Sequence, residues 1–211
     1  QIGKGHIQLS GNILGSFTDS IPTISMSFSA ADMGFKVHAI NQSVTDIGFE
    51  GTASSGRLTD FSEAAINIEG FHVSFPKGDL DAEIGLKNLV VPEIDVELNG
   101  ETDLQIIKEI IDSKSIQKMK GSLGISGNIS GTVDTDAGTF MDQTGTLEIS
   151  MNDVEFSSAD YTVEEMNGVL YLEENRFGLR ETGLTIDSND IRMEGWIDNL
   201  LPYFMGYKGD I

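Results

Sequence analysis

The chain has 211 residues, which is enough to bury a sizeable core in one large or two small domains. Its 34 acidic and 13 basic residues give a formal net charge of -21. This charge excludes a nucleic-acid partner, whose phosphates require a basic surface, and argues against adhesion along an anionic membrane. The chain has no cysteine, which excludes disulfides and thiolate metal sites.

The sequence contains no membrane-spanning or targeting segment. A spanning helix needs about 18 to 20 consecutive apolar residues, and no run approaches that length. No charged and then hydrophobic leader opens the chain. Since the chain begins at Gln1 rather than Met, we expect a fragment or processed form of a longer protein. Any membrane anchor is expected to lie outside it.

Apolar residues recur at every second position through the first half of the chain, which is typical of half-buried strands. These runs lie at residues 5–11, 24–28, 35–39, 47–50, 64–68, 71–75, 80–86 and 94–98. A further strand-like run extends over 84–91 and ends before Pro92. We expect turns at Glu69–Gly70, over residues 51–56 and 76–79, and at Asn99–Gly100, because Gly and Pro interrupt the pattern there.

One segment has helical rather than strand periodicity. Leu104, Ile107 and Ile111 share one helical face, which predicts a helix over about 103–112. Thr102 and Gln105 form a Thr-x-x-Gln capping box, and Asp103 complements the positive end of the helix dipole. A helix this short is marginal alone in water, so we expect it to lie on the apolar strands around it.

Strand periodicity returns after the helix. A Gly-rich alternating run at 121–131 precedes runs at 146–151, 168–172, 177–179, 184–186 and 191–196. About a dozen short strands and one helix predict a mainly β, antiparallel fold.

An internal similarity suggests repeated units. Residues 4–15 are similar in sequence to residues 120–131. Aligned without gaps, the two segments have the same Lys, Gly, Ser, Gly, Asn, Ile and Gly at equivalent positions. A period this long suggests a repeated multi-strand unit, with units at 1–118 and 119–211 in a single β domain. Coincidence in a Gly- and Ser-rich β protein is the alternative.

These motifs resemble the AsmA-like family of bacterial envelope proteins, which is related to TamB and to bridge-like lipid-transfer proteins. The resemblance rests on the Gly-bounded alternating strand, the run from Leu86 to Pro92, the short helix opening at Thr102, and the later segments from Gly145 to Gly195. It implies a periplasmic, inner-membrane-anchored protein whose strands form an extended, strongly curved antiparallel sheet, a groove or half-pipe. Such a protein uses an apolar sheet face in lipid handling or outer-membrane assembly. It implies no catalytic residue and no cofactor. The implied partners are lipid acyl chains, other envelope proteins and missing repeats of the same chain.

The candidate functional residues are those of the apolar face. An antiparallel sheet with one apolar face buries it against a second sheet, a helix or a ligand. The candidates for facing lipid are Ile94, Val96, Leu98, Leu147, Ile149, Met151, Leu170, Leu172, Leu184 and Ile186. The alternative is that these residues form the dry core of a secreted or surface β-sandwich that binds carbohydrate or protein.

Charged residues offer weaker candidates. Lys108, Lys114, Lys118 and Lys120 form a basic cluster that either compensates the helix dipole or contacts a headgroup or partner. The run from Asp134 to Gly138 begins like a calcium loop but lacks the later ligands, and no two histidines have metal-ligand spacing, so we expect no metal. A hydrolase would need clustered carboxylates, and nothing singles out a pair.

Overall fold

The computed structural model describes residues 4–15, 22–37, 42–56, 61–111, 116–134, 139–157, 162–173, 176–186 and 188–198. These residues form eleven strands and one helix. The strands are β1 (Lys4–Leu14), β2 (Thr23–Val37), β3 (Gln42–Ser54), β4 (Ala65–Phe75), β5 (Gly78–Lys87), β6 (Glu93–Asp103), β7 (Lys118–Asp134), β8 (Thr139–Ser157), β9 (Thr162–Glu173), β10 (Arg176–Ile186) and β11 (Asn189–Asp198), and α1 (Leu104–Ile111) lies between β6 and β7.

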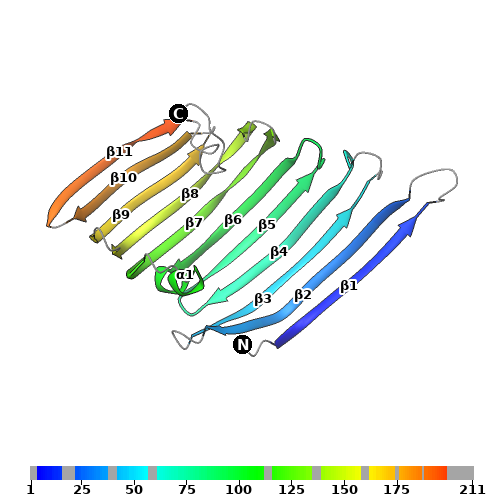
Figure 1. Ribbon diagram of the computed structural model, residues 1–211, viewed down its shortest axis with the longest axis horizontal. Helices are drawn as coiled ribbons and strands as arrows, with labels where there is room; N and C mark the ends of the chain where they lie inside the picture. Colours follow the sequence, from blue (N-terminus) through cyan, green and yellow to red (C-terminus); the bar gives the residue numbers. More distant parts are fainter. Residues whose placement is uncertain are drawn as a thin grey trace.

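All eleven strands belong to one open antiparallel sheet. Each strand pairs with the next in the chain, so β1 and β11 form opposite edges of the sheet (Figure 1). The helix α1 follows β6 directly and lies at the ends of the central strands, beside β7 (Figure 1). The predicted fold class is confirmed, since the described chain is mainly β, antiparallel and not closed into a barrel.

Several predicted turns are wrong because the strands are longer than their apolar runs. Asn99 and Gly100 lie inside β6 and pair with Asp81 and Leu80. Residues 51–54 lie inside β3. These small or polar residues still supply backbone groups to the ladder, so the strand continues through them.

Glu69 and Gly70 mark a β-bulge rather than a turn. The register shifts between Ile68 and Phe71, so the two predicted runs form the single strand β4. Gly70 has a φ of 57°, a left-handed conformation that glycine adopts without steric cost.

The run predicted to continue to residue 91 stops at Lys87 instead. Asn88 has a φ of 53°, and its side-chain Oδ1 accepts hydrogen bonds from the backbone N–H groups of Val90 and Val91 at 3.3 and 3.2 Å. An Asn side chain that satisfies the backbone in this way competes with the ladder and makes a turn. Leu89, Val90 and Val91 are therefore exposed.

The helix lies where it was predicted, but a different residue caps it. Oδ1 of Asp103 accepts a hydrogen bond from the backbone N–H of Gln105 at 2.7 Å, which is N-cap geometry. Oδ2 of Asp103 also pairs with Nζ of Lys77 at 2.6 Å. The expected Thr102–Gln105 box is wrong, since Thr102 belongs to β6 and its buried Oγ1 has no hydrogen-bond partner.

The best-packed core lies under α1. Leu104 of the helix is buried with Met151 and Val154 of β8. Partly buried apolar residues from β7, β9, β10 and the helix pack around them: Ile107, Met119, Leu123, Met166, Leu170 and Leu179. The helix therefore supplies the second layer over this part of the sheet.

Truncating the helix anchor should destabilise the fold strongly. Leu104→Ala removes a side chain that is 3% exposed, and we expect the free energy of unfolding in urea to fall by about 2–5 kcal/mol. The control Leu9→Ala changes a leucine that is 69% exposed and should change the free energy of unfolding by less than about 0.5 kcal/mol. Equal effects of the two substitutions would contradict the assignment of the core.

Three substitutions distinguish the two capping arrangements. Asp103→Ala should lower the free energy of unfolding by about 1 kcal/mol, whereas Asp103→Asn keeps an N-cap acceptor and isolates the contribution of the Lys77 pair. Thr102→Val should be neutral or stabilising, because it removes a buried hydroxyl that lacks a partner. Urea unfolding of the three variants measures these effects. If Thr102→Val lowers the free energy of unfolding more than Asp103→Ala does, Thr102 rather than Asp103 caps the helix.

Candidate functional site: the apolar face of the sheet

The two faces of the sheet differ sharply in chemistry. In β6, Ile94, Val96 and Leu98 alternate with acidic or amide residues, and the apolar set is half-buried while the polar set is exposed. We call the side of Ile94, Val96 and Leu98 the apolar face and the opposite side the polar face. Side chains alternate between faces along each strand, so pairing carries this assignment across the sheet.

The register places all ten predicted lipid-facing residues on the apolar face. Val96 pairs with Ile129 of β7, and Leu98 pairs with Gly127, which pairs in turn with Leu147. The same rows continue into β9 and β10 through the pairs Leu147↔Leu172, Ile149↔Leu170 and Met166↔Leu184. Ile186 lies two residues beyond Leu184 in β10, and Met151 two residues beyond Ile149 in β8.

The helix divides this face into a covered part and an open part. Met151 is 7% exposed and belongs to the core cluster under α1, and Leu170 packs against that cluster. Leu184 is also buried, at 9% exposed, but it is not part of this cluster. These side chains are therefore not available to a ligand in this conformation. Ile94, Val96 and Leu98 lie on strand β6 and are only half-buried.

The open part is largest at the two edges of the sheet. On the apolar face of β1, Ile7, Leu9 and Ile13 are 78%, 69% and 65% exposed. Further exposed residues on the same face are Met26, Ile84, Ile191, Met193 and Ile197. Within the described part of the chain, no second sheet covers these residues.

A row of phenylalanines crosses the open part and was not among the predicted site residues. The ring centroids of Phe28 and Phe49 are 6.1 Å apart, and those of Phe49 and Phe71 are 6.4 Å apart. Gly51 makes room for this row, since a Cβ there would lie 2.3 Å from the Phe28 ring. The alternation of each strand placed these residues on one face, but only the register shows that they are neighbours.

The predicted basic cluster is not a free positive patch. Nζ of Lys118 pairs with Oε2 of Glu155, and this hydrogen bond, reinforced by the charges of Lys118 and Lys120, lowers the pKa of the Glu155 carboxyl. Lys108 lies on the helix, and Lys114 lies outside the described residues. The structure therefore brings Lys118 and Lys120 together around a carboxylate.

The polar face is acidic over the middle of the sheet. A shallow hollow there is lined by acidic side chains of β4, β5 and β6, with Lys87 among them: Glu69, Glu83, Glu93, Asp95 and Glu97. Such a surface is well solvated and repels anionic ligands. It leaves the opposite, apolar face as the better candidate for binding lipid.

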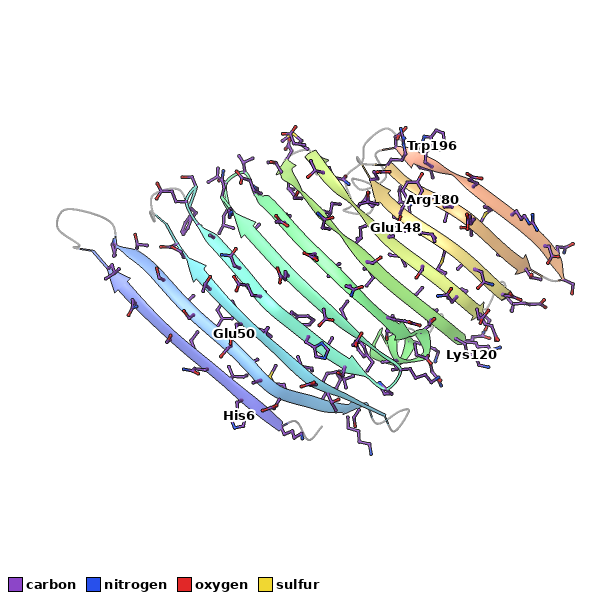
Figure 2. All side chains as sticks on the ribbon, turned by 180° about the vertical axis from the view of Figure 1, so that it is seen from behind. His6, Glu50, Lys120, Glu148, Arg180 and Trp196 are labelled. Atoms are coloured by element: carbon purple, nitrogen blue, oxygen red, sulfur yellow. The ribbon has the colours of Figure 1, made fainter. Side chains whose placement is uncertain are left out.

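Arginine and aromatic side chains gather on the polar face near β11, which sequence reasoning missed. The Arg180 guanidinium lies 4.7 Å from the Tyr171 ring centroid and pairs with Glu148. Arg176 lies 5.0 Å from the Trp196 ring, which is 61% exposed. Figure 2 shows Glu148 on β8, Arg180 on β10 and Trp196 on β11. The period-two pattern of β8 to β11 was the signal that could have placed them on one face.

Neither a metal site nor a bilayer-spanning helix occurs in the described ranges. No group of three or more potential metal-ligating side chains is found there. Of the loop that begins like a calcium site, Asp134 is described, while Asp136 and Gly138 lie outside those ranges. No described helix is long and apolar enough to cross a bilayer.

His72 joins three strands on the polar face. Its Nδ1 lies 2.7 Å from Oδ1 of Asp81, and its Nε2 lies 3.0 Å from Oγ of Ser74 and 3.8 Å from Oδ2 of Asp46. The hydrogen bond to Asp81, together with the negative charges of Asp81, Asp46 and Asp79, raises the pKa of His72. Protonated His72 therefore links β4 electrostatically to β3 and β5.

The stability contributed by His72 should depend on pH. A raised folded-state pKa contributes stability that is fully present below the unfolded pKa of about 6.5 and is lost as pH rises through the folded value. The difference in free energy of unfolding between wild type and His72→Gln should be larger at about pH 5.5 than at about pH 8.5. His6→Gln on β1 is the control, and a pH-independent difference for His72→Gln would contradict the proposed linkage.

No protein-family model, curated protein or solved structure was found to match the chain. The functional argument therefore rests on the geometry of the sheet itself.

Proposed function

We propose that the chain is a non-enzymatic protein of the bacterial periplasm, of AsmA-like type, that contributes to lipid handling or outer-membrane assembly. It holds lipid acyl chains against the open part of the apolar face. The observation that carries the proposal is that this face exposes large aliphatic side chains, such as Ile7 and Leu9, at 78% and 69%. No cofactor is required for such a role.

The energetics favour an occupant on the open face. Fully burying one aliphatic side chain is worth about 1.5–3 kcal/mol, and the open face presents many such side chains in continuous rows. Contiguous exposed apolar surface on a soluble protein usually marks a binding site. An apolar ligand on this surface would therefore bind with a substantial hydrophobic driving force.

The dimensions and the charge distribution suit an acyl chain. Five interstrand spacings of about 4.8 Å separate β1 from β6, so the apolar face spans about 24 Å between these strands. A bilayer core of about 30 Å is two acyl chains thick, so one extended chain fits across this distance. The acidic polar face stays hydrated and disfavours lying flat on an anionic membrane.

The alternative function, a sandwich-type binding module, requires a second sheet over the apolar face. All eleven described strands belong to one sheet, which does not supply that layer. One observation still favours carbohydrate or protein binding, namely the exposed Trp196 with the stacked Arg176 on the polar face. This alternative places the ligand on the opposite side of the sheet from the acyl chain.

A face-specific pair of double variants tests the proposal. Ile84 pairs with Val96 on the apolar face, and the adjacent pair Glu83↔Glu97 lies on the polar face of the same two strands. We expect Ile84→Gln with Val96→Gln to weaken binding of a fluorescent acyl chain by about tenfold or more, because it removes two aliphatic contacts. Glu83→Gln with Glu97→Gln is the matched control and should leave binding unchanged.

Lipid extraction of the purified chain followed by mass spectrometry gives an independent measurement. Co-purifying lipid, together with loss of uptake in the apolar-face variant alone, would support the proposal. A lipid-free preparation that takes up no fluorescent acyl chain would contradict it, as would equal effects of the two double variants.

A further inference from the structure

The strand pairing of β1 to β5 repeats in β7 to β11. Leu9 in β1 corresponds to Ile125 in β7, because residues 4–15 are similar to residues 120–131. Leu9 pairs with Phe28 of the next strand, and Ile125 likewise pairs with Ile149 of the next strand. The register then shifts at the same place in both copies, between Lys4 and His6 and between Lys120 and Ser122. Each shift faces an aspartate in left-handed conformation, Asp32 with a φ of 53° and Asp153 with a φ of 49°.

The hairpins at the other end of each set also match. The last pair of the β4–β5 hairpin is Phe75↔Gly78 and that of the β10–β11 hairpin is Ile186↔Asn189, so each closing pair is three positions apart in the chain. In both hairpins the first strand has a bulge at the same distance from the turn, after Ile68 and after Leu179. β1 therefore corresponds to β7, and β11 to β5.

The two copies differ in what lies beside their first strand. β7 pairs on its outer edge with β6, and α1 docks on the apolar face next to it. β1 has no strand on its outer edge within the described part of the chain. The exposed aliphatic residues of β1 follow from this difference, since their counterparts Leu123, Ile125 and Ile129 in β7 are half-buried.

The surface on which α1 docks is also repeated. Four residues that pack under the helix are Leu123, Met151, Val154 and Met166. The register assigns their counterparts in the first copy as Ile7, Ala30, Met33 and Ile47, all of which are apolar. The first copy thus has an apolar patch of helix-docking composition beside a strand edge that no other described strand pairs with. In this patch Ile7 is exposed, Met33 and Ile47 are half-buried, and Ala30 is buried.

We propose that the free edge of β1 and the adjacent patch of Ile7, Ala30, Met33 and Ile47 bind a strand–helix segment patterned like β6–α1. The partner strand alternates apolar with acidic residues and adds to β1 by antiparallel backbone pairing. Its following helix has an apolar stripe that covers the patch, as Leu104 covers Met151 in the second copy. The patch shares Ile7 with the open part of the apolar face, but pairing of a partner strand with the edge of β1 does not require a bound acyl chain.

The register of the bound segment follows from β6 and β7. In that pair Val96 faces Ile129 and Thr102 faces Leu123. A β6-type strand on β1 therefore places the Val96 position opposite Ile13 and the Thr102 position opposite Ile7. Because these two positions are six residues apart, about 20 Å along the strand, the register is sharply defined.

Cysteine cross-linking tests both the site and the register, since the chain has no native cysteine. The probe is a synthetic peptide with the sequence of residues 93–111, carrying either Thr102→Cys or Val96→Cys. The protein carries Ile7→Cys or Ile13→Cys, both at exposed positions. Directly paired residues of neighbouring strands lie about 4.5–5.5 Å apart at Cα, within the range a disulfide bridges.

We expect a mixed disulfide in a glutathione buffer for Ile7→Cys with Thr102→Cys and for Ile13→Cys with Val96→Cys. The other two combinations, Ile7→Cys with Val96→Cys and Ile13→Cys with Thr102→Cys, should give a disulfide yield at least about tenfold lower, since their sulfurs are held far apart. Adding Leu104→Asp to the peptide should lower the yield severalfold if its helix docks on the patch. Equal yields in all four combinations, no cross-link at millimolar peptide, or preferential disulfides between two copies of the protein would overturn the proposal.

Discussion

The constraint on which the described structure depends is the backbone pairing of a single meandering sheet that has one apolar face. Each strand pairs with its neighbours in the chain, so the period-two pattern of every strand is carried in phase across the sheet. This aligns aliphatic residues on one side and carboxylates on the other. A sheet built in this way needs a second layer over its apolar side, and α1 is the layer that the described residues supply.

The short helix therefore determines where the apolar face is closed and where it is open. Leu104 joins Met151 and Val154 in a buried cluster, whereas the aliphatic residues of β1 remain exposed. Apolar residues at every second position are therefore buried under the helix in one part of the face and exposed to solvent in another. The proposal that acyl chains occupy the open part rests on this difference and on the acidic character of the opposite face.

The repeated register adds a second level of organisation. β6 and α1 stand between two five-strand sets that share bulge positions, such as those that face Asp32 and Asp153. Bulges at matching places bend both sets in the same way and keep their apolar rows in phase. The unit boundaries at 118 and 119 remain a prediction, and the matched pairing gives the edge of β1 a defined chemical preference for a strand like β6.

The sequence by itself determined the mainly β class, the helix at Leu104–Ile111 and the face on which each candidate residue lies, because these follow from local periodicity. Where each strand ends depends on the tertiary structure, because Gly70 and Asn88 both have a positive φ, of 57° and 53°, yet β4 continues through Gly70 and β5 stops before Asn88. The tertiary structure also decided that Asp103 rather than Thr102 caps the helix, and that Met151 is covered while Ile84 is open. Burial and hydrogen bonding depend on which strands lie side by side, and that information is not local in the chain.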